Sequence, residues 1–489
     1  MADVVLALDQ GTTSSKALLL DPATLAVLAT AARPVAIAAP RPGWVEQDAA
    51  EVWESLRAAA ADALAQVPDA NPVAIAISNQ RESAVAWDGT GTPLAPLISW
   101  QDQRGVPFLE PISTAANQQM VRARTGLELT AMYSAAKLRW LVDQSGGRGD
   151  ARFGTVDSWL VDRLTGGRTY AIEAGNASRT LLFDITTLGW DPELCALFGV
   201  PLAALPEVRP SLGPWGVTAG VRGIPDGVPI LSVLGDSHAA LFGHWTLTPA
   251  HAGAGKATYG TGSSVMVPTT DAASRRDGVS TTLAWQLDAP LWAYEANILY
   301  SGAGLDWLAA TIGADGGRGL SELAADTVDS QGAVFVPALN GLGAPWWEPN
   351  AVGTLTGLST RTGREHIARA GLESVAHQIC DVIDVMDPDG AMTLLHAGGG
   401  ATKSALLMRL QANLLGRELL VAAVADISPV GAGALAARAL GYEPRPSGLP
   451  ARSFLPSPDF SADRRLAERE RWRDALSRAG VRGAAPPRP

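Results

Sequence analysis

Cysteine is scarce in this chain of 489 residues, which contains only Cys195 and Cys380. Two distant cysteines form neither a disulfide framework nor a thiolate metal cluster, so we expect a reducing, cytoplasmic environment. Long apolar runs are also missing, because no stretch reaches the roughly 18 residues of a membrane span. The N-terminus lacks the basic and apolar regions of a signal peptide, and we expect no membrane partner.

Positive charge is limited as well. The chain has 38 Lys and Arg against 49 Asp and Glu, a formal net charge of −11, and no dense basic block. This balance argues against nucleic acid as a partner but permits a small anionic ligand at a local site. With 47% hydrophobic and 18% charged residues, the composition is that of a globular protein. A chain of this length favours two large domains or more.

The stretch from residue 4 to residue 20 predicts a buried hairpin, because two apolar runs flank a polar turn. Gly11 allows a ligand to approach the backbone closely, and the hydroxyl and N–H groups of the turn can donate to anionic oxygen. Asp9, at the end of the first strand, could hold a hydrated Mg²⁺ against a phosphate. The alternative is an ordinary hairpin with a turn rich in Ser and Thr.

A second hairpin of the same plan is expected at residues 256–267. We interpret it as an internal repeat, with the chain duplicated near its middle. The expected domains are 1–245 and 246–445, followed by a segment 446–489. This last segment contains a charged helix (463–479) and a Pro-rich tail that we expect to be disordered.

Polar side chains follow two predicted strands, a buried one at 73–77 that leads into residues 78–83 and another that leads into residues 99–104. Open α/β sheets bind ligands at the carboxyl ends of their strands. Trp100 among these polar groups suggests a lid or a pocket wall, although a packed surface Trp is an equal alternative. The expected helices are 49–67, 134–141, 153–160 with Asp157 near its cap, 239–243, 303–312, 364–387, 404–415 and 429–437.

Three local patterns are misleading. Residues 431–436 match the dinucleotide pattern G-x-G-x-x-A, but a small-residue helix face packed on a neighbour explains them better. Residues 253–256 resemble a P-loop, but the spacing fails. Asp236, Ser237 and His238 are consecutive, so they cannot form a hydrolase triad, which needs groups from separate segments.

A series of short motifs covers nearly the whole chain. The motifs are Asp9 to Lys16, 79–82, 100–102, 153–159, 176–179, 235–236, 259–262 and 341–347. In this order they resemble the FGGY carbohydrate kinases, and among these most of all the glycerol kinases. The resemblance implies an α/β protein with the actin/hexokinase-like ATPase fold, which is ribonuclease H-like, and two domains separated by a cleft. It assigns sugar or polyol and phosphate binding to the N-terminal domain and nucleotide binding to the C-terminal domain.

The resemblance implies ATP as phosphate donor, with its phosphates in the cleft between the two hairpin turns. The residues expected to contact the nucleotide are Thr12, Thr13, Ser14, Lys16, Thr261, Gly262, Gly302, Asp306, Gly399, Gly400 and Ser404. Lys16 stands where glycerol kinases usually have Arg, so it keeps the charge but loses the bidentate fork.

Asp236 is, by the same resemblance, the general base that accepts the proton of the substrate hydroxyl while the oxygen attacks the γ-phosphorus. Asp9 and Asp236 are the expected Mg²⁺ ligands. The alternative role of Asp236 is to cap the helix that follows it.

The residues expected around the acceptor are Arg81, Glu82, Trp100, Met132, Asp236, Ser237 and Ser264. Within the resemblance, Arg81 and Glu82 match a pair that hydrogen-bonds polyol hydroxyls, and Trp100 matches an apolar wall under the carbon chain. Three positions depart from the glycerol kinase pattern, because Tyr, Gln and Phe are expected where Met132, Ser237 and Ser264 stand. Each change removes bulk or a fixed donor, so we infer a roomier pocket.

These features predict ATP-dependent phosphorylation of a hydroxyl of a small polyol or sugar, such as glycerol. The alternative acceptor is a four- or five-carbon polyol or ketose such as erythritol, xylulose or ribulose. A non-catalytic sugar or nucleotide sensor on the same fold is a further alternative. We expect a homo-oligomer, a dimer, although the sequence places no interface.

Overall fold

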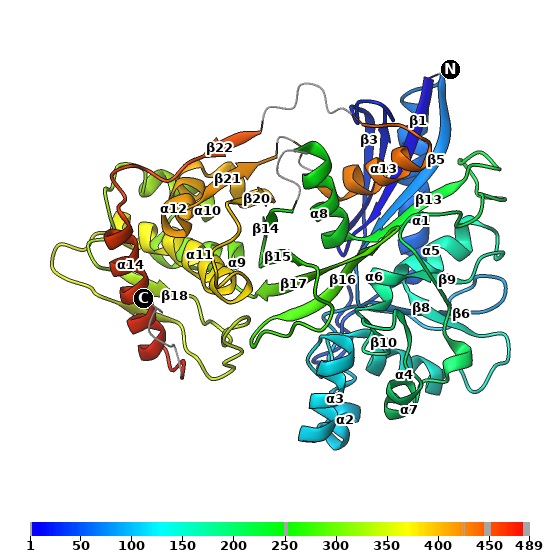
Figure 1. Ribbon diagram of the computed structural model, residues 1–489, viewed down its shortest axis with the longest axis horizontal. Helices are drawn as coiled ribbons and strands as arrows, with labels where there is room; N and C mark the ends of the chain where they lie inside the picture. Colours follow the sequence, from blue (N-terminus) through cyan, green and yellow to red (C-terminus); the bar gives the residue numbers. More distant parts are fainter. Residues whose placement is uncertain (1, 249–252, 423, 425, 445–450, 483–489) are drawn as a thin grey trace.

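The computed structural model describes residues 2–248, 253–422, 424, 426–444 and 451–482 and has two lobes, each built around a large sheet (Figure 1). The N-terminal lobe lies on the right of Figure 1 and the C-terminal lobe on the left. The expected Pro-rich tail and the expected boundary at residues 445 and 446 fall outside the described residues.

The N-terminal lobe contains a five-stranded sheet whose strands run in the spatial order β13-β5-β1-β2-β3. These strands are β1 (Ala2–Gln10), β2 (Ser14–Leu20), β3 (Val27–Pro34), β5 (Ala70–Asn79) and β13 (Ile230–Gly235). β1 pairs antiparallel with β2 and parallel with β5, so the expected hairpin is confirmed. Residues Val4 to Leu8 are all buried, because helices cover both faces of this sheet.

The C-terminal lobe repeats this plan. Its sheet has the order β16-β17-β15-β14-β20-β21-β22. The strands are β14 (Gly255–Tyr259), β15 (Ser263–Thr269), β16 (Ser280–Gln286), β17 (Pro290–Ile298), β20 (Leu394–Gly398), β21 (Glu418–Val421) and β22 (Arg452–Phe454). β14 pairs antiparallel with β15 and parallel with β20, as β1 does with β2 and β5, so the internal repeat is confirmed.

Helices cover the outer faces of the two sheets. The longer ones are α1 (Ala49–Ala65), α3 (Ala115–Thr125), α4 (Ser134–Gln144), α5 (Val156–Leu164), α8 (Asp236–Leu247), α9 (Gly302–Ile312), α10 (Gly316–Leu323), α11 (Arg364–Met386), α12 (Ala405–Leu415), α13 (Ile427–Ala439) and α14 (Ala462–Arg478). The apolar faces of α1 and α5 pack on the N-terminal sheet, and those of α9, α11 and α12 pack on the C-terminal sheet.

Short elements extend the N-terminal lobe. They are β4 (Glu46–Gln47), β6 (Ala84–Trp87), β7 (Leu97–Ile98), β8 (Arg152–Thr155), β9 (Ala171–Glu173), β10 (Phe183–Asp184), β11 (Gly189–Trp190), β12 (Glu207–Arg209), α2 (Val106–Leu109), α6 (Ala174–Ala177) and α7 (Pro192–Phe198). The C-terminal lobe adds β18 (Val334–Val336) and β19 (Thr354–Thr356). The strands β4, β7, β6 and β8 form a second sheet in the N-terminal lobe.

Two helices, α8 and α13, cross between the lobes (Figure 1). α13 comes from the C-terminal half but packs on β5 and β1, and its Val430 and Ala434 belong to the same apolar cluster as Val5. α8 comes from the N-terminal half and shares that apolar cluster with Met266 and Trp285 of the C-terminal sheet. A Cβ atom on Gly431 would overlap the backbone carbonyl of Ala239, so the two helices touch backbone to backbone. The interpretation of residues 431–436 as a packed small-residue face is therefore confirmed.

One local prediction was wrong, and one alternative is excluded. Residues 153–155, expected to begin a helix, belong to β8 because they pair with β6, and the helix begins only at Val156. Asp236 does not cap α8, because Gly235 occupies the N-cap position and Asp236 is the first helical residue. Its carboxylate is therefore available for other contacts.

The contact between α8 and α13 predicts a sensitivity to added volume. Gly431→Ala should lower the free energy of unfolding by about 1–3 kcal/mol, because overpacking forces two backbones apart. Thermal unfolding measures the effect. Gly89→Ala is the matched control, because a Cβ atom there meets no atom within 4 Å. Equal melting temperatures for the two variants would contradict the tight crossing.

Candidate active site

Hydrogen bonds within the turn between β1 and β2, and from residues beside it, fix the conformation of this turn. The N–H of Gly11 donates to the carbonyl of Ser14 at 2.9 Å, and Gln47 Nε2 donates to the carbonyl of Thr12 at 2.8 Å. The indole Nε1 of Trp100 donates to Thr12 Oγ1 at 3.0 Å. The structure thus brings Trp100 beside the turn, while Thr13 is exposed and Ser14 half-buried.

Charged side chains converge at the base of this turn. Lys16 and Asp9 are partners across the hairpin, and Lys16 Nζ forms an ion pair with Asp426 Oδ1, just before α13. Burial raises the pKa of Asp9 to about 6, and the negative charges of Asp236 and Asp426 act in the same direction. No cluster of three His, Cys, Asp or Glu in the described ranges could hold a metal by itself. Two carboxylates completed by phosphate oxygens and water suit Mg²⁺.

The turn between β14 and β15 is the corresponding feature of the C-terminal lobe. Its glycines pack against neighbouring backbone, since the N–H of Gly302 donates to the carbonyl of Gly260 at 2.9 Å. A Cβ atom on Gly262 or Gly399 would overlap a backbone carbonyl, and Gly399 has a φ of 93°, which favours glycine. The structure thus brings Thr261, Gly262, Gly302 and Gly399 together, and a Cβ on Gly400 would meet open space.

The helix α10 connects the remaining predicted nucleotide residues. Asp306 Oδ1 accepts a hydrogen bond from the N–H of Gly317 at 3.2 Å, and Ser321 Oγ donates to Ser404 Oγ at 2.9 Å. Ser404 is also the N-cap of α12. Both residues therefore border α10, whose part in the site the sequence analysis did not anticipate.

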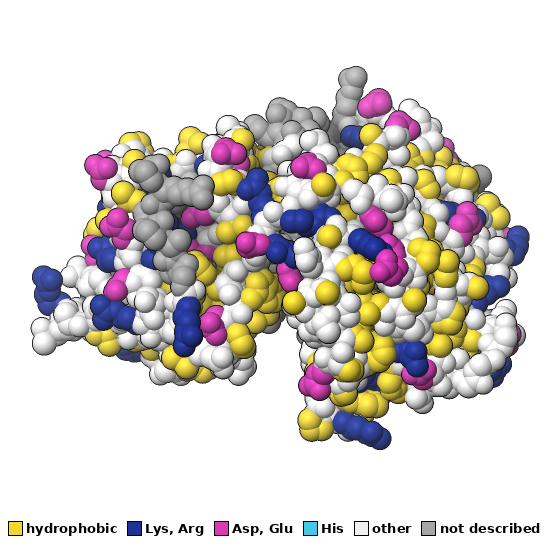
Figure 2. Space-filling model, turned by 60° about the horizontal axis from the view of Figure 1, so that its bottom comes forward, with side chains coloured by type: hydrophobic (Ala, Val, Ile, Leu, Met, Phe, Trp, Pro, Cys, Tyr) yellow, Lys and Arg dark blue, Asp and Glu magenta, His cyan; other side chains and the backbone are white. Residues whose placement is uncertain are grey.

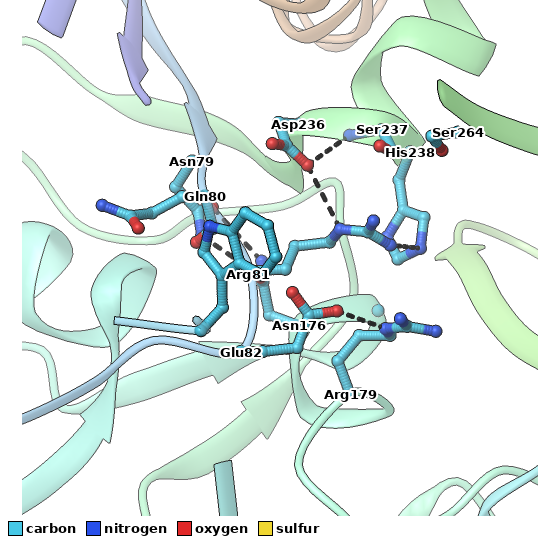
Figure 3. Close-up of polar contacts among 12 residues, drawn as sticks. Asn79, Gln80, Arg81, Glu82, Asn176, Arg179, Asp236, Ser237, His238 and Ser264 are labelled. Carbon is cyan, nitrogen blue, oxygen red and sulfur yellow. Dashed lines mark hydrogen bonds and ion pairs between the residues drawn. The ribbon is translucent and has the colours of Figure 1, made fainter. Parts of the chain in front are cut away.

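An ionic cluster around Arg81 joins the two lobes, and Figure 3 shows part of it, the contacts of Arg81 with Asp236 and of Glu82 with Arg179. Arg81 Nε donates to Asp236 Oδ1 at 3.1 Å, and its two terminal nitrogens donate to Glu295 at 2.9 and 2.5 Å. Arg81 belongs to the loop after β5, whereas Glu295 lies on β17. Burial disfavours ionisation of Glu295, but Arg179 and Arg81 outweigh it and hold the pKa of Glu295 well below its usual value.

Glu82 and Arg179 extend this cluster. Arg179 Nε donates to Glu82 Oε1 at 2.6 Å, and Arg179 lies over the ring of Tyr133 at 5.1 Å. Glu82 has a φ of 62°, a strained value for a residue with a side chain. Such strain persists where the surroundings fix the backbone, and it concentrates at functional sites.

His238 supports Arg81 from α8 (Figure 3). The guanidinium only donates, so His238 Nε2 accepts from Arg81 at 3.2 Å and the ring proton lies on Nδ1. Burial lowers the pKa of His238 well below its usual value, and Arg81 adds to this effect. The imidazole is therefore a neutral acceptor that orients Arg81.

The three positions that depart from the glycerol kinase pattern are all half-buried. Met132 lies in the loop before α4, where Lys137 Nζ donates to its carbonyl at 2.5 Å. Ser237 follows Asp236 at the start of α8, and Ser264 lies on β15 of the other lobe. The residues predicted to surround the acceptor thus come from both lobes, which a deep indentation separates on the face shown in Figure 2.

Several site residues were missed by the sequence analysis. Arg179 lay within a quoted motif without a role, Lys256 was named only in the second hairpin and in the rejected P-loop match, and Glu295 was not considered. The available signal was a lone charged residue inside an otherwise apolar strand, because a buried charge requires a partner.

The comparisons with known proteins agree along the chain. The model of the FGGY family of carbohydrate kinases, N-terminal domain, matches residues 4–243, and that of the C-terminal domain matches residues 255–440. The chain is 40% identical over 497 residues to the apulose kinase of Pectobacterium atrosepticum, covering 99% of each protein. It is 42% identical over 449 residues to the glycerol kinase of a Geobacter species, covering 89% of the chain and 90% of that kinase.

Solved structures agree as well. The glycerol kinase of Plasmodium falciparum, solved with ADP, superposes with a TM-score of 0.89 at 27% identity and covers 98% of each chain. The xylulose kinase of Rhodospirillum rubrum has a TM-score of 0.85 at 26% identity, covering 97% of this chain and 99% of its own. The expected two-domain actin/hexokinase-like fold is therefore confirmed. In the described ranges, no helix has the length and apolar character needed to cross a membrane.

The ionic cluster predicts a large stability effect at Glu295. Glu295→Gln should lower the free energy of unfolding by about 3–5 kcal/mol, because it leaves two buried guanidinium groups short of negative charge. Urea unfolding measures the loss. Glu322→Gln is the control, since Glu322 pairs with Arg318 on the surface and is 66% exposed; we expect a change within about 0.5 kcal/mol there. A comparable loss in both variants would refute the role of Glu295.

Proposed function

Because this chain belongs to the FGGY family of carbohydrate kinases, we propose that Asp236 is the general base in its phosphorylation of a small polyol or ketose. The reaction class, ATP-dependent phosphorylation of a polyol or sugar, follows from the family and from the related kinases. The contact between Arg81 and Asp236 carries the proposal, because it joins the expected base to the expected acceptor site. The side chain of Asp236 is 42% exposed, so a ligand can still reach it.

In our proposal the nucleotide bridges the two hairpin turns. The N-terminal turn supplies Thr12, Thr13, Ser14 and Lys16, and the C-terminal turn supplies Thr261 and Gly262. Gly302, Asp306, Gly399, Gly400 and Ser404 hold the rest of the nucleotide. When the nucleotide binds, Lys16 leaves its ion pair with Asp426 and contacts a phosphate oxygen instead. The ammonium group of Lys16 then lies where negative charge develops during phosphoryl transfer.

The acceptor binds at the ionic cluster in this proposal. Arg81 donates to an acceptor oxygen, the carboxylate of Glu82 accepts from its hydroxyls, and Trp100 packs under its carbons. One carboxylate oxygen of Asp236 accepts the proton of the attacking hydroxyl. The new bond joins this oxygen to the γ-phosphorus, the bond from that phosphorus to the β-phosphate oxygen breaks, and ADP leaves.

Mg²⁺ would be held by Asp9 and Asp236 together with phosphate oxygens and water. When bound, it supplies neutralisation of the developing phosphate charge. Burial is the main cause of the raised pKa of Asp9, and the negative charge of Asp236 adds to it; a bound cation would relieve this smaller, repulsive part.

We propose a class of acceptors and not a single compound, because the relatives named for apulose and for glycerol are about equally similar to the chain. The proposed domains are 1–245 and 246–445, with a C-terminal segment 446–489. We propose a cytoplasmic location, which the free, buried thiols of Cys195 and Cys380 support. We also propose a homodimer, and light scattering on the purified chain tests it by measuring the molecular mass in solution.

The assignment of Asp236 predicts the behaviour of Asp236→Asn. This variant should lower kcat by about 10²-fold or more, because it removes the proton acceptor, and it should retain ATP binding. A coupled assay of ADP release measures turnover with glycerol, erythritol, xylulose, ribulose and apulose. The control is Asp277→Asn, whose side chain is 97% exposed. Unchanged turnover in Asp236→Asn would remove this residue from the mechanism, and no stimulation of the native chain by any acceptor would favour the sensor.

The two-lobed site predicts closure around its ligands. A non-hydrolysable ATP analogue together with an accepted polyol or sugar should reduce the radius of gyration, because water beside the γ-phosphate competes as acceptor. Small-angle scattering measures the change, with the analogue alone as the reference. An unchanged radius with both ligands would contradict closure.

A further inference from the structure

One face of the C-terminal sheet carries an ordered row of polar residues at the cleft. Strand register places Thr258 beside Ser264, and Ser264 beside Asn297. All three are half-buried, as is Gly398 on the far side of Thr258. We call Thr258, Ser264 and Asn297 the polar shelf.

A second row lies two residues further along the same strands. It consists of His396, Lys256, Met266 and Glu295, which pair in this order and are all buried. Because side chains two apart on a strand share a face, this row lies beside the polar shelf on the same face of the sheet, two residues further from the turn between β14 and β15. Helix α8 covers it, with His244 stacked on His396 at 5.0 Å. Since Glu295 binds Arg81, the polar shelf borders the acceptor end of the site.

Lys256 connects the two rows. Its Nζ donates to Thr258 Oγ1 at 3.2 Å and to Ser264 Oγ at 3.4 Å, and within the described ranges it forms no ion pair. Burial and the positive charge of Arg81 lower the pKa of Lys256 to about 8, while Glu295 and Asp236 favour the ammonium form. At neutral pH the group is therefore mainly a cation held by two hydroxyls.

This arrangement fixes the direction of the hydrogen bonds. An ammonium has donors only, so Thr258 and Ser264 must accept from Lys256. The hydroxyl protons of the polar shelf are then free to be donated into the cleft. Hydroxyl donors of this kind suit an oxygen that can only accept hydrogen bonds, such as a ketone carbonyl. Each hydroxyl is a stronger donor because it accepts a hydrogen bond from the charged Lys256.

We propose that Lys256, acting through Ser264 and Thr258, positions a carbonyl or hydroxyl oxygen of a four- or five-carbon acceptor. The proposal rests on the proposed function and narrows its substrate class to acceptors longer than glycerol. The small side chain of Ser264 leaves space for the additional carbons, where the glycerol kinase pattern has Phe. Lys256 is thus a positioning residue and not a catalytic one.

The test compares kcat/KM for ribulose, xylulose and erythritol with that for glycerol, using the full chain and ATP. The native protein should prefer at least one longer acceptor. Ser264→Ala and Lys256→Met should each reduce the ratio of longer acceptor to glycerol about 10-fold, mainly through KM, because one hydrogen bond to a charged network is lost or weakened. Ser264→Phe should reduce the ratio about 100-fold by filling the space.

Controls separate this inference from the broader proposal. Ser263 lies on the same strand but faces Ser301 in the interior, at 2.8 Å, so Ser263→Ala should leave the ratio unchanged. Lys256→Gln retains an N–H donor and should recover part of the ratio lost in Lys256→Met. If the native chain phosphorylates glycerol best, or if the Ser264 variants leave the ratio intact, this inference is wrong while the kinase assignment stands. If no acceptor is phosphorylated, both are wrong.

Discussion

The crossing of α8 and α13 is the contact on which the site depends. Each helix follows the last parallel strand of its own lobe's repeat and then packs across the boundary, so the two lobes share one apolar cluster. Gly431 allows the helices to meet backbone to backbone. Asp236 begins α8, and Asp426 immediately precedes α13, so the crossing also brings two helix N-termini and two carboxylates toward the same region. The positive ends of both helices favour the anionic groups of a nucleotide there.

Charge compensation stabilises the ionic cluster around Arg81. Arg81 and Arg179 are surrounded by Glu82, Glu295 and Asp236, and they supply most of the donors that these carboxylates accept. A buried charge is costly unless it is paired, so each member restricts the positions of the others. Because Glu295 comes from the opposite lobe, the geometry around the proposed base depends on both halves of the chain.

Glycines have a different role at the proposed nucleotide end. Gly260, Gly262, Gly302 and Gly399 bring three chain segments within backbone contact of one another, where a Cβ atom would come within 3.2 Å of a backbone carbonyl. The exposed amides and hydroxyls of such turns can surround phosphate oxygens without large movements. The N-terminal turn lacks this packing and is instead supported by side chains, including Trp100. The repeated hairpin has therefore diverged in the way it is held.

The sequence by itself determined the local elements and the order of the motifs. The hairpins at residues 4–20 and 256–267, the helices along the second half and the small-residue face of α13 follow from periodicity and turn chemistry, which act between near neighbours. Tertiary structure alone decided which charges meet. Glu295 is 214 residues from Arg81 along the chain, and Asp426 is 410 residues from Lys16. A strand's pattern shows that a charge is buried but does not identify its partner, because pairing between lobes depends on the packing of the sheets and of α8 and α13. The direction of the hydrogen bonds at the polar shelf likewise depends on strand register, which places Lys256 next to Ser264 and Thr258.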